Sequence, residues 1–175
     1  MQIREATLSD SERIRNVHLQ AFDKSEAQIV ADIAVNLLNE KTPIKIISLV
    51  AIQDNKVVGH IAFSPAYSID NSEHFAYILA PLAVSPKHQK NKIGSSLVLY
   101  GLDTISNMGS FIVFVYGDPQ YYSRFGFKTD LAKNFTPQHS LQQPAGWHAL
   151  KLNSSVFPEG GTIKCVDSLD DPNLW

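Results

Sequence analysis

A lysine-rich loop near the middle of the sequence has the composition of an anion-binding segment. The loop contains Lys87, Lys90 and Lys92. It follows an apolar run that ends at Val84 and precedes a helical pattern that begins at Ile93. The first N–H groups of a helix have no internal partner and lie at its positive end, so they attract phosphate. Neither GxxxxGK(S/T) nor GxGxxG occurs in the sequence, which excludes two common nucleotide-binding motifs. These features alone are compatible with phosphate binding and with a solvated loop that caps a helix.

An aromatic segment, residues 117–127, is the second place where chemistry is possible. It reads GDPQYYSRFGF. Pro119 suits the first turn of a short helix, which should end at Gly126. Tyr121 and Tyr122 are adjacent on that helix and point about 100° apart, so both cannot face the core equally. Core packing is the ordinary use of such a cluster, but one phenol is left for a polar role.

Metal and thiol chemistry have little support in the sequence. No His/Cys/Asp cluster has the spacing of metal ligands, so we expect no metal. Cys165 falls in the last predicted strand, where a buried apolar role is more typical than a nucleophilic one.

The elements that position these segments follow from apolar periodicity and turn residues. Capping-box patterns at Ser9–Glu12 and Ser25–Gln28 predict the starts of two helices. Further helices are predicted at Ile93–Ser106, with Leu97, Val98, Leu102 and Ile105 buried, and at Pro119–Phe125. Strands are predicted at Gln2–Glu5, Ile46–Ile52, Val57–Phe63, Phe75–Val84, Phe111–Tyr116, Trp147–Leu152 and Thr162–Val166, with a turn at Asp54-Asn55-Lys56. This order of elements predicts a mixed α/β fold.

The composition fits one ordinary globular domain of 175 residues, with 44% hydrophobic and 18% charged residues. We expect a single domain over residues 1–167 and a tail, residues 168–175, whose apolar end packs on its own domain or on a neighbour. The net charge of −2 gives no reason to expect nucleic-acid binding. The single cysteine fits a reducing compartment, and no apolar stretch has the length of a leader or a membrane span. We therefore expect a cytoplasmic monomer or homodimer that binds neither nucleic acid nor membrane.

Taken together, the two segments resemble those of the GNAT N-acetyltransferases. The acetyl-CoA-binding loop of that superfamily reads Gln/Arg-x-x-Gly-x-Gly/Ala. Residues 89–94 read QKNKIG, so Gln89 and Gly94 match, and Lys92 stands where the first Gly is expected. The YYSRFGF run resembles the later aromatic-Tyr-x-x-x-Gly-Phe motif. The chain closely resembles the YhbS-like branch of predicted acetyltransferases over residues 3–166. This resemblance is carried by Gly-Asp-Pro directly before the YYSRFGF run, by GHI at 59–61, by FSP at 63–65 and by PLAV at 81–84.

The resemblance implies a fold and a co-substrate. The GNAT acyl-CoA N-acyltransferase fold is an α/β (α+β) fold with a mixed central sheet, in which a splayed central strand pair is flanked by helices. Acetyl-CoA lies in the opening. Backbone groups of Leu82 and Val84, with Ala83 between them, would hold the pantetheine arm and thioester like an added strand. The pyrophosphate would be held by amides of Gln89, Lys90, Asn91, Lys92, Ile93, Gly94 and Ser95.

The family's loop also implies an unusual backbone at Lys92. If the loop keeps the family's path, this position needs a left-handed or closely approached backbone, which glycine adopts without strain. A lysine there costs roughly 1 kcal/mol or more.

The resemblance further implies direct acetyl transfer to a primary amine, and this reaction needs two proton transfers. An alkylammonium with a pKa near 10.4 is neutral in only about one molecule in 2,500 at pH 7, so a base must take a proton. The departing thiolate resembles a thiol of pKa about 8.5 and is helped by an acid. Tyr122, at the motif's tyrosine, is the expected general acid, and Tyr121 is expected to pack.

The identity of the base is left open by the sequence. Glu26 begins the second predicted helix, in the region that borders the acceptor pocket in the family, although such a carboxylate is more often a cap or a surface group. His60 and His74 are alternatives, but a lone histidine near a strand is more often structural.

The leading interpretation is an N-acetyltransferase that acts on a small-molecule or protein amine. The competing interpretation is a non-catalytic acyl-CoA-binding sensor or interaction domain. Lys92 in place of glycine favours the sensor, whereas Gln89, Gly94 and Tyr122 favour the enzyme.

Overall fold

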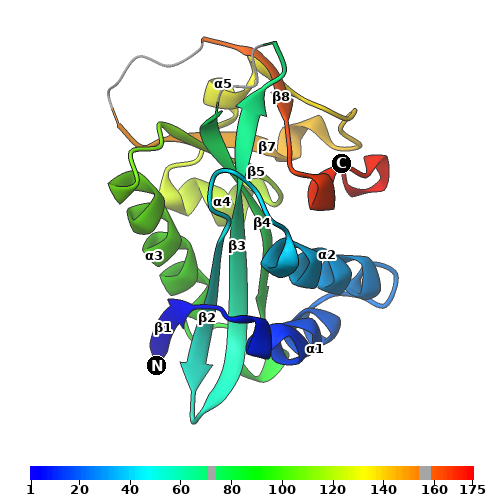
Figure 1. Ribbon diagram of the computed structural model, residues 1–175, viewed down its shortest axis with the longest axis vertical. Coiled ribbons are helices and arrows are strands. Elements are labelled where there is room, and N and C mark those ends of the chain that lie inside the picture. Colours follow the sequence, from blue (N-terminus) through cyan, green and yellow to red (C-terminus); the bar gives the residue numbers. More distant parts are fainter. Residues whose placement is uncertain (71–73, 154–158) are drawn as a thin grey trace. The chain divides into compact units, whose positions relative to one another are not determined.

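The computed structural model describes residues 1–70, 74–153 and 159–175 (Figure 1). Its strands are β1 (Gln2–Glu5), β2 (Ile47–Gln53), β3 (Lys56–Ser68), β4 (His74–Val84), β5 (Ile112–Tyr116), β6 (Phe135–Pro137), β7 (Trp147–Lys151) and β8 (Gly161–Lys164). Its α-helices are α1 (Ser11–Ala21), α2 (Ala27–Asn39), α3 (Ile93–Asn107), α4 (Pro119–Tyr122) and α5 (Thr129–Ala132). Short 3₁₀ helices cover Leu8–Asp10, Pro86–His88, Ser123–Phe125, Pro144–Gly146, Asp167–Leu169 and Pro172–Leu174. The predicted elements are all present, most with small shifts at their ends, although β3 continues five residues past the predicted end at Phe63. β6 and α5 were not predicted.

The strands form a mixed eight-stranded sheet in the order β1-β2-β3-β4-β5-β7, and β8 pairs with β3 and β6. The β4–β5 pair is parallel, whereas β1–β2, β2–β3 and β5–β7 are antiparallel. The β4–β5 ladder joins Ala76–Leu79 to Ile112–Val115 and ends there, before β4 itself ends. Pro81, which follows within β4, has no N–H to donate to a ladder. The early end of this ladder agrees with the splayed central strand pair that the family resemblance predicts.

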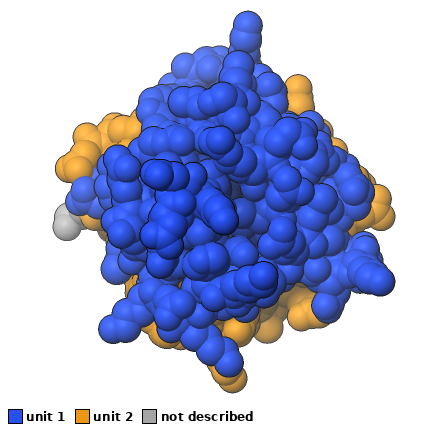
Figure 2. Space-filling model, turned by 90° about the horizontal axis from the view of Figure 1, so that it is seen from below, with its two compact units in different colours: residues 1–63, 80–103 blue, residues 64–79, 104–175 orange. Residues whose placement is uncertain are grey.

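The chain forms two compact units (Figure 2). Unit 1 contains residues 1–63 and 80–103, and unit 2 contains residues 64–79 and 104–175. Strands β3 and β4 and helix α3 therefore contribute residues to both units. The segment predicted as a tail, residues 168–175, belongs to unit 2.

In unit 1, helices α1 and α2 bury small and branched apolar side chains. Ile14 on α1, Ala34 on α2 and Val50 on β2 form one fully buried cluster. A second close contact joins β3 and α3, because a Cβ placed on Gly101 would lie only 2.1 Å from Cε2 of Phe63. The glycine at position 101 thus allows the Phe63 ring to pack directly against the helix backbone.

The two predicted capping boxes are wrong in detail, although both helices are present. The first helix begins through the 3₁₀ turn Leu8–Asp10, and the Asp10 carboxylate accepts a hydrogen bond from Thr7 N–H at 2.9 Å. The same carboxylate accepts two hydrogen bonds from the Arg4 guanidinium, at 2.7 and 2.9 Å. At α2 the N-cap residue is Glu26, and its side chain makes no capping hydrogen bond. Sequence spacing favoured Ser9 because it carries no information about the Arg4 partner on β1.

Unit 2 is built around a cluster of aromatic rings. Phe114 stacks on Trp147 with ring centroids 5.0 Å apart, and Trp175 contacts Trp147 edge-on at 5.9 Å. Trp175 is only 5% exposed, and its Nε1–H donates to the carbonyl of Leu169 at 3.0 Å. Of the two positions expected for the apolar end of the tail, packing on its own unit is the one observed.

Asp10→Asn should lower the free energy of unfolding by about 1–2 kcal/mol at pH 7. This is the lower part of the range for hydrogen bonds to a charged group, because Arg4 is 34% exposed and partly screened. The Arg4 hydrogen bonds hold the pKa of Asp10 well below its usual range. The carboxylate therefore stabilises the fold fully above the pKa of an unfolded aspartate, about 3.9, and loses this effect as the pH falls. Urea unfolding at pH 7 and pH 3 measures both effects.

Asp32→Asn is the matched control. The Asp32 carboxylate pairs with Arg15 but is 44% exposed, so its loss should cost under about 0.5 kcal/mol. Equal losses in the two variants, or an Asp10→Asn effect that is as large at pH 3 as at pH 7, would contradict this account.

Candidate functional site

The loop that follows β4 in unit 1 is tied to the strands at two points. Ser85 N–H donates to the carbonyl of Val58 on β3 at 2.9 Å. The side-chain amide of Gln89 reaches back and donates to the carbonyl of Val84 at 3.1 Å. Between these points, Pro86 begins a 3₁₀ turn that ends at His88. Gln89, the first residue of the family motif, therefore closes the loop onto the end of its own strand.

The backbone then becomes left-handed at two lysines. The φ angle is +64° at Lys90 and +61° at Lys92. The left-handed backbone that the family's loop implies at Lys92 is thus present, whereas the one at Lys90 was not predicted. Each such residue without glycine's freedom costs roughly 1–2 kcal/mol, so the rest of the loop must hold this path.

The first turn of α3 presents backbone donors next to these lysines. The first hydrogen bond of the helix is donated by Ser96 N–H to the carbonyl of Lys92, at 2.9 Å. The N–H groups of Ile93, Gly94 and Ser95 precede it, and the start of a helix offers them no internal acceptor. Three donors at the positive end of a 15-residue helix, with lysines before them, form a site suited to a phosphate or pyrophosphate.

The first turn of α3 is held in place by its contact with β3. Ile93 is 2% exposed and Leu97 is fully buried. A Cβ on Gly59 would lie 3.0 Å from Leu97 Cδ1 and 3.1 Å from Ile93 Cγ2, so a larger residue would press tightly on these side chains, and glycine fits without displacing them. The predicted buried side of α3 is confirmed, since Leu97, Val98, Leu102 and Ile105 are all buried. This tight fit at position 59 could not be read from the sequence.

The last part of β4 leads into this loop with alternating burial. Pro81 and Ala83 are buried, whereas Leu82 and Val84 are partly exposed. The β5 ladder has already ended at Leu79. The backbone of residues 82–84 can therefore pair with an extended ligand in the way an added strand does.

In unit 2, Tyr122 lies on α4, and its ring packs closely against a glycine. A Cβ on Gly117 would lie 2.7 Å from Cε2 of Tyr122. The Tyr122 ring contacts Tyr121 and Phe127 edge-on, with centroids 5.0 and 5.8 Å apart. Burial, with smaller contributions from Tyr121 and Asp118, raises the pKa of Tyr122 well above its usual value. The phenol is therefore fully protonated at neutral pH and available as a proton donor.

Tyr121 has a different environment from its neighbour. Arg124 lies over the Tyr121 ring at 4.4 Å from the centroid, and its Nε–H donates to the Tyr121 carbonyl at 3.1 Å. Gly126 ends the segment with a φ of +91°, as predicted from its position. These contacts agree with the expectation that Tyr121 packs.

The candidate bases differ sharply in exposure. Glu26 is exposed at the N-terminus of α2. His60 is fully buried, and hydrogen bonds to His18 and Ser48 at 2.8 and 2.9 Å occupy both ring nitrogens. Burial lowers the pKa of His60 well below its usual range, and this imidazole has no nitrogen left for an acceptor. The side chain of His74 lies outside the described residues. His60 is therefore structural, and its partners His18 and Ser48 are too distant along the chain to be recognised from local patterns.

Neither a metal centre nor a membrane-spanning helix is found among the residues that the structure describes. These residues include no group of three or more His, Cys, Asp or Glu side chains that could hold a metal ion. Cys165 is buried, as predicted, although it follows β8 and does not belong to it. Within the described ranges, no helix combines the length and apolar character that a membrane span requires.

Comparison with known proteins assigns the family and, with it, the acyltransferase class. The family described as "Acetyltransferase (GNAT) domain" matches residues 2–129. The chain belongs to the GNAT acetyltransferases.

Individual relatives are similar over much of the chain. An uncharacterized N-acetyltransferase of Escherichia coli strain K12, YjhQ, is 32% identical over 163 residues, which cover 91% of this chain and 88% of YjhQ. A second one, YhbS, is 40% identical over 85 residues, covering 47% of this chain and 49% of YhbS. The crystal structure of E. coli YhbS in complex with CoA has a TM-score of 0.83 at 24% identity and covers 97% and 92% of the two chains, which shows a shared fold. A GNAT acetyltransferase from Brucella melitensis in complex with acetyl-CoA has a TM-score of 0.77 at 29% identity, covering 97% of each chain.

Lys92→Gly should raise the free energy of unfolding by about 0.5–1 kcal/mol. Relief of the left-handed strain outweighs the greater freedom that glycine gives the unfolded chain. Lys87→Gly is the matched control, because Lys87 lies in a 3₁₀ turn and its φ is not positive. Lys87→Gly should lower the free energy of unfolding by about 0.5–1 kcal/mol, because glycine gives the unfolded chain more freedom. Chemical denaturation of both variants measures the two changes, and a loss of stability in Lys92→Gly would show that the left-handed backbone carries no strain.

Proposed function

We propose that this protein transfers the acetyl group of acetyl-CoA directly to a primary amine of a small molecule or a protein. The observation that carries the proposal is the strand–loop–helix from Leu82 to Ser95. It combines a strand end without a β5 partner, a loop closed by Gln89 and the free donors of the first turn of α3. The CoA and acetyl-CoA complexes of the two similar structures support the choice of co-substrate.

Each part of this segment suits one part of the co-substrate. The amides of residues 89–95 would donate to the pyrophosphate, and the exposed Lys90 and Lys92 would add positive charge. Backbone groups of residues 82–84 would pair with the amides of the pantetheine arm. Because Val84 O already accepts from Gln89, only its second lone pair is available for the arm.

Tyr122 is the proposed general acid. Its phenol would donate a proton to the sulfur as the carbon–sulfur bond breaks, and a base would take a proton from the amine. Because burial raises the pKa of Tyr122, the phenol stays protonated across the neutral and mildly alkaline range. Glu26 is the proposed base, with an exposed carboxylate that accepts a proton directly or through water.

The compartment and the acceptor are part of the same proposal. A single buried cysteine suits a reducing compartment, and we propose the cytoplasm. A monomer or homodimer that acts on a diffusible amine needs neither nucleic acid nor membrane.

A non-catalytic acyl-CoA sensor is the second candidate. The observation in its favour is Lys92, a residue with a left-handed backbone at the motif position where the family has glycine. A sensor would bind acetyl-CoA but would release no thiol in the presence of mixed amines, whereas an enzyme would release it. An acceptor screen with thiol detection distinguishes the two.

Acetyl-CoA should bind to the native protein and raise its melting temperature. At 100 times the dissociation constant, a ligand that binds only the folded state adds about 2.7 kcal/mol of stability. Thermal unfolding and titration calorimetry with millimolar acetyl-CoA measure this. No shift in melting temperature together with no heat of binding would refute the assignment.

Lys92→Gly provides an internal check on the binding mode. Loss of one ammonium and relief of strain act in opposite directions, so the affinity at 0.15 M salt should change by less than about tenfold. The salt dependence of binding should become weaker, because one exposed charge has been removed. A gain of a hundredfold would favour the sensor.

Tyr122→Phe should lower turnover by about 10²-fold or more, the usual scale for a group that transfers a proton. The variant removes only the hydroxyl, so the packing around Gly117 and the affinity for acetyl-CoA should change little. Because the pKa of Tyr122 is raised, the wild-type rate should show no fall from phenol ionisation between about pH 7 and 10. Tyr121→Phe is the control and should retain activity. Unchanged turnover in Tyr122→Phe, with chemistry rate-limiting, would remove Tyr122 from the role.

A further inference from the structure

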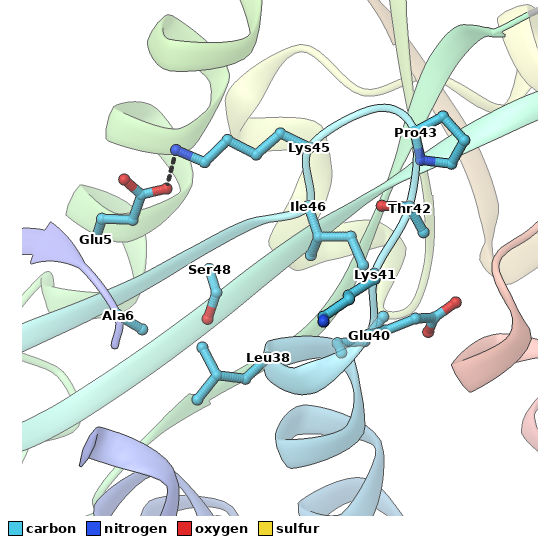
Figure 3. Close-up of a pocket in the computed structure, with 11 residues that line it drawn as sticks. Glu5, Ala6, Leu38, Glu40, Lys41, Thr42, Pro43, Lys45, Ile46 and Ser48 are labelled. Carbon is cyan, nitrogen blue, oxygen red and sulfur yellow. Dashed lines mark ion pairs between the residues drawn. The ribbon is translucent and has the colours of Figure 1, made fainter. Parts of the chain in front are cut away.

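A pocket of about 420 Å³ lies in unit 1, apart from the segment assigned to acetyl-CoA (Figure 3). It is formed where β1 ends, where α2 ends and where the following segment enters β2. Its walls include Ala6, Leu38 and Ile46, and its polar groups include Ser48, Lys41 and the Glu5–Lys45 ion pair. The volume falls in the lower part of the usual range for small-molecule sites. None of the residues assigned to acetyl-CoA lines this pocket.

Ser48 connects the pocket to a buried chain of hydrogen bonds. Its side chain is nearly buried, and Oγ lies 2.9 Å from Nε2 of His60. Nδ1 of His60 lies 2.8 Å from Nε2 of His18. Both rings are fully buried, and Nδ1 of His18 has no hydrogen-bond partner within the described part of the chain. Burial lowers the pKa of His18 to about 3, so both imidazoles are neutral and each carries one N–H.

The unpartnered Nδ1 of His18 decides which residue donates and which accepts in each of these hydrogen bonds. If His60 donated to His18, the single N–H of His18 would sit on Nδ1 and would be a buried donor without an acceptor. If His18 donates to His60, Nδ1 of His18 is only an unfilled lone pair, which is the less costly arrangement. His60 then donates from Nε2 to Ser48 Oγ. The hydroxyl proton of Ser48 is therefore not used by His60 and is available to an acceptor in the pocket.

The charged side chains at the pocket are arranged unequally. Lys45 pairs with Glu5 at one side (Figure 3). The ammonium of Lys41 points inward, toward the side on which Ser48 lies, whereas the carboxylate of Glu40 points away (Figure 3). Among the residues that the structure describes, no acidic side chain lies within ion-pair distance of Lys41. The pocket thus offers one unpaired positive charge and one hydroxyl donor beside an apolar wall.

We propose that this pocket binds a small aliphatic monocarboxylate. Its carboxylate accepts from the Ser48 hydroxyl and from the Lys41 ammonium, and its hydrocarbon chain packs on Leu38 and Ile46. A carboxylate is the ligand that satisfies both donors at once, since hydrogen bonds to a charged acceptor are the stronger ones. The apolar wall that Leu38 and Ile46 form is short, which suits a hydrocarbon chain of a few carbons. This proposal does not depend on acetyl transfer.

Four probes test the proposal on the full chain: acetate, butyrate, butyramide and butylammonium. Titration calorimetry and the ¹⁵N shifts of the imidazoles are the two readouts. Butyrate should bind at least tenfold more tightly than butyramide and more tightly than acetate. Its binding should shift the His60 signals while both rings stay neutral, with the N–H on Nε2. Butylammonium should not bind.

Variants assign the contacts. Lys41→Met should weaken the binding of butyrate at least tenfold. Because the Lys41 side chain is exposed, this substitution leaves the fold intact. Ser48→Ala should weaken the binding of butyrate about tenfold or more. Glu40→Gln is the control and should change the affinity less than twofold. Acetyl-CoA affinity should be the same in all three variants, which also verifies that Ser48→Ala is folded.

Four results would overturn the proposal. One is equal affinity for butyrate and butyramide, and another is unchanged butyrate affinity in Lys41→Met. The third is no detectable binding of butyrate to the wild-type protein at millimolar concentration. Binding of butylammonium in place of butyrate would reverse the assigned charge and would also reject it.

Discussion

The close approach of α3 to β3 is the contact on which the candidate site in unit 1 depends. Positions 93, 97 and 101 lie one turn apart along a single stripe of α3, and positions 59 and 63 lie on one face of β3. Gly101 on the helix leaves room for the Phe63 ring, and Gly59 on the strand allows the close fit of Leu97 and Ile93. The first contact holds the helix near its N-terminus, where Gly59 meets Ile93 and Leu97. The second holds it about two turns later, where Phe63 meets Gly101. They fix where the free amides of the first turn lie, and thereby where an anion can bind.

This fixed helix explains how the loop before it can tolerate strain. Two lysines adopt left-handed backbones, and the loop has only a few residues in which to distribute the cost. Two residues hold the loop at its ends. Gln89 is hydrogen-bonded to the end of β4, and Ile93, the first residue of α3, is buried against β3. With both ends held, the path between them is determined more by geometry than by the preference of the residues on it. A lysine can therefore occupy a position where glycine would be easier.

Periodic features could be predicted from the sequence, and features that join distant segments could not. The buried stripe of α3, the Asp54-Asn55 turn with its positive φ angles and the stop at Gly126 all follow from local rules. The capping boxes failed because Asp10 is bound by Arg4, whose position depends on the pairing of β1. His60 has no histidine near it in the sequence, because its partner His18 is 42 residues away. β6, with three residues, is too short to give a periodic signal.

The candidate site shows the same division. The motif residues from Gln89 to Gly94 and Tyr122 could be named from spacing, since each is fixed by a short pattern. Their environments could not be named, because the room for the Tyr122 ring comes from Gly117 and the support of α3 comes from Gly59. In both cases the decisive neighbour is a residue without a side chain, which leaves no mark on hydrophobic periodicity.

Because Cys165 is buried, its reaction with a thiol reagent can be used to detect local opening of the structure. It is the only thiol in the sequence and is 4% exposed, next to the segment that carries Trp175. A thiol reagent can reach it only when this part of unit 2 opens, so the rate of labelling measures the free energy of that opening. The same shielding keeps the protein's own thiol from reacting quickly in an assay that counts released coenzyme thiol.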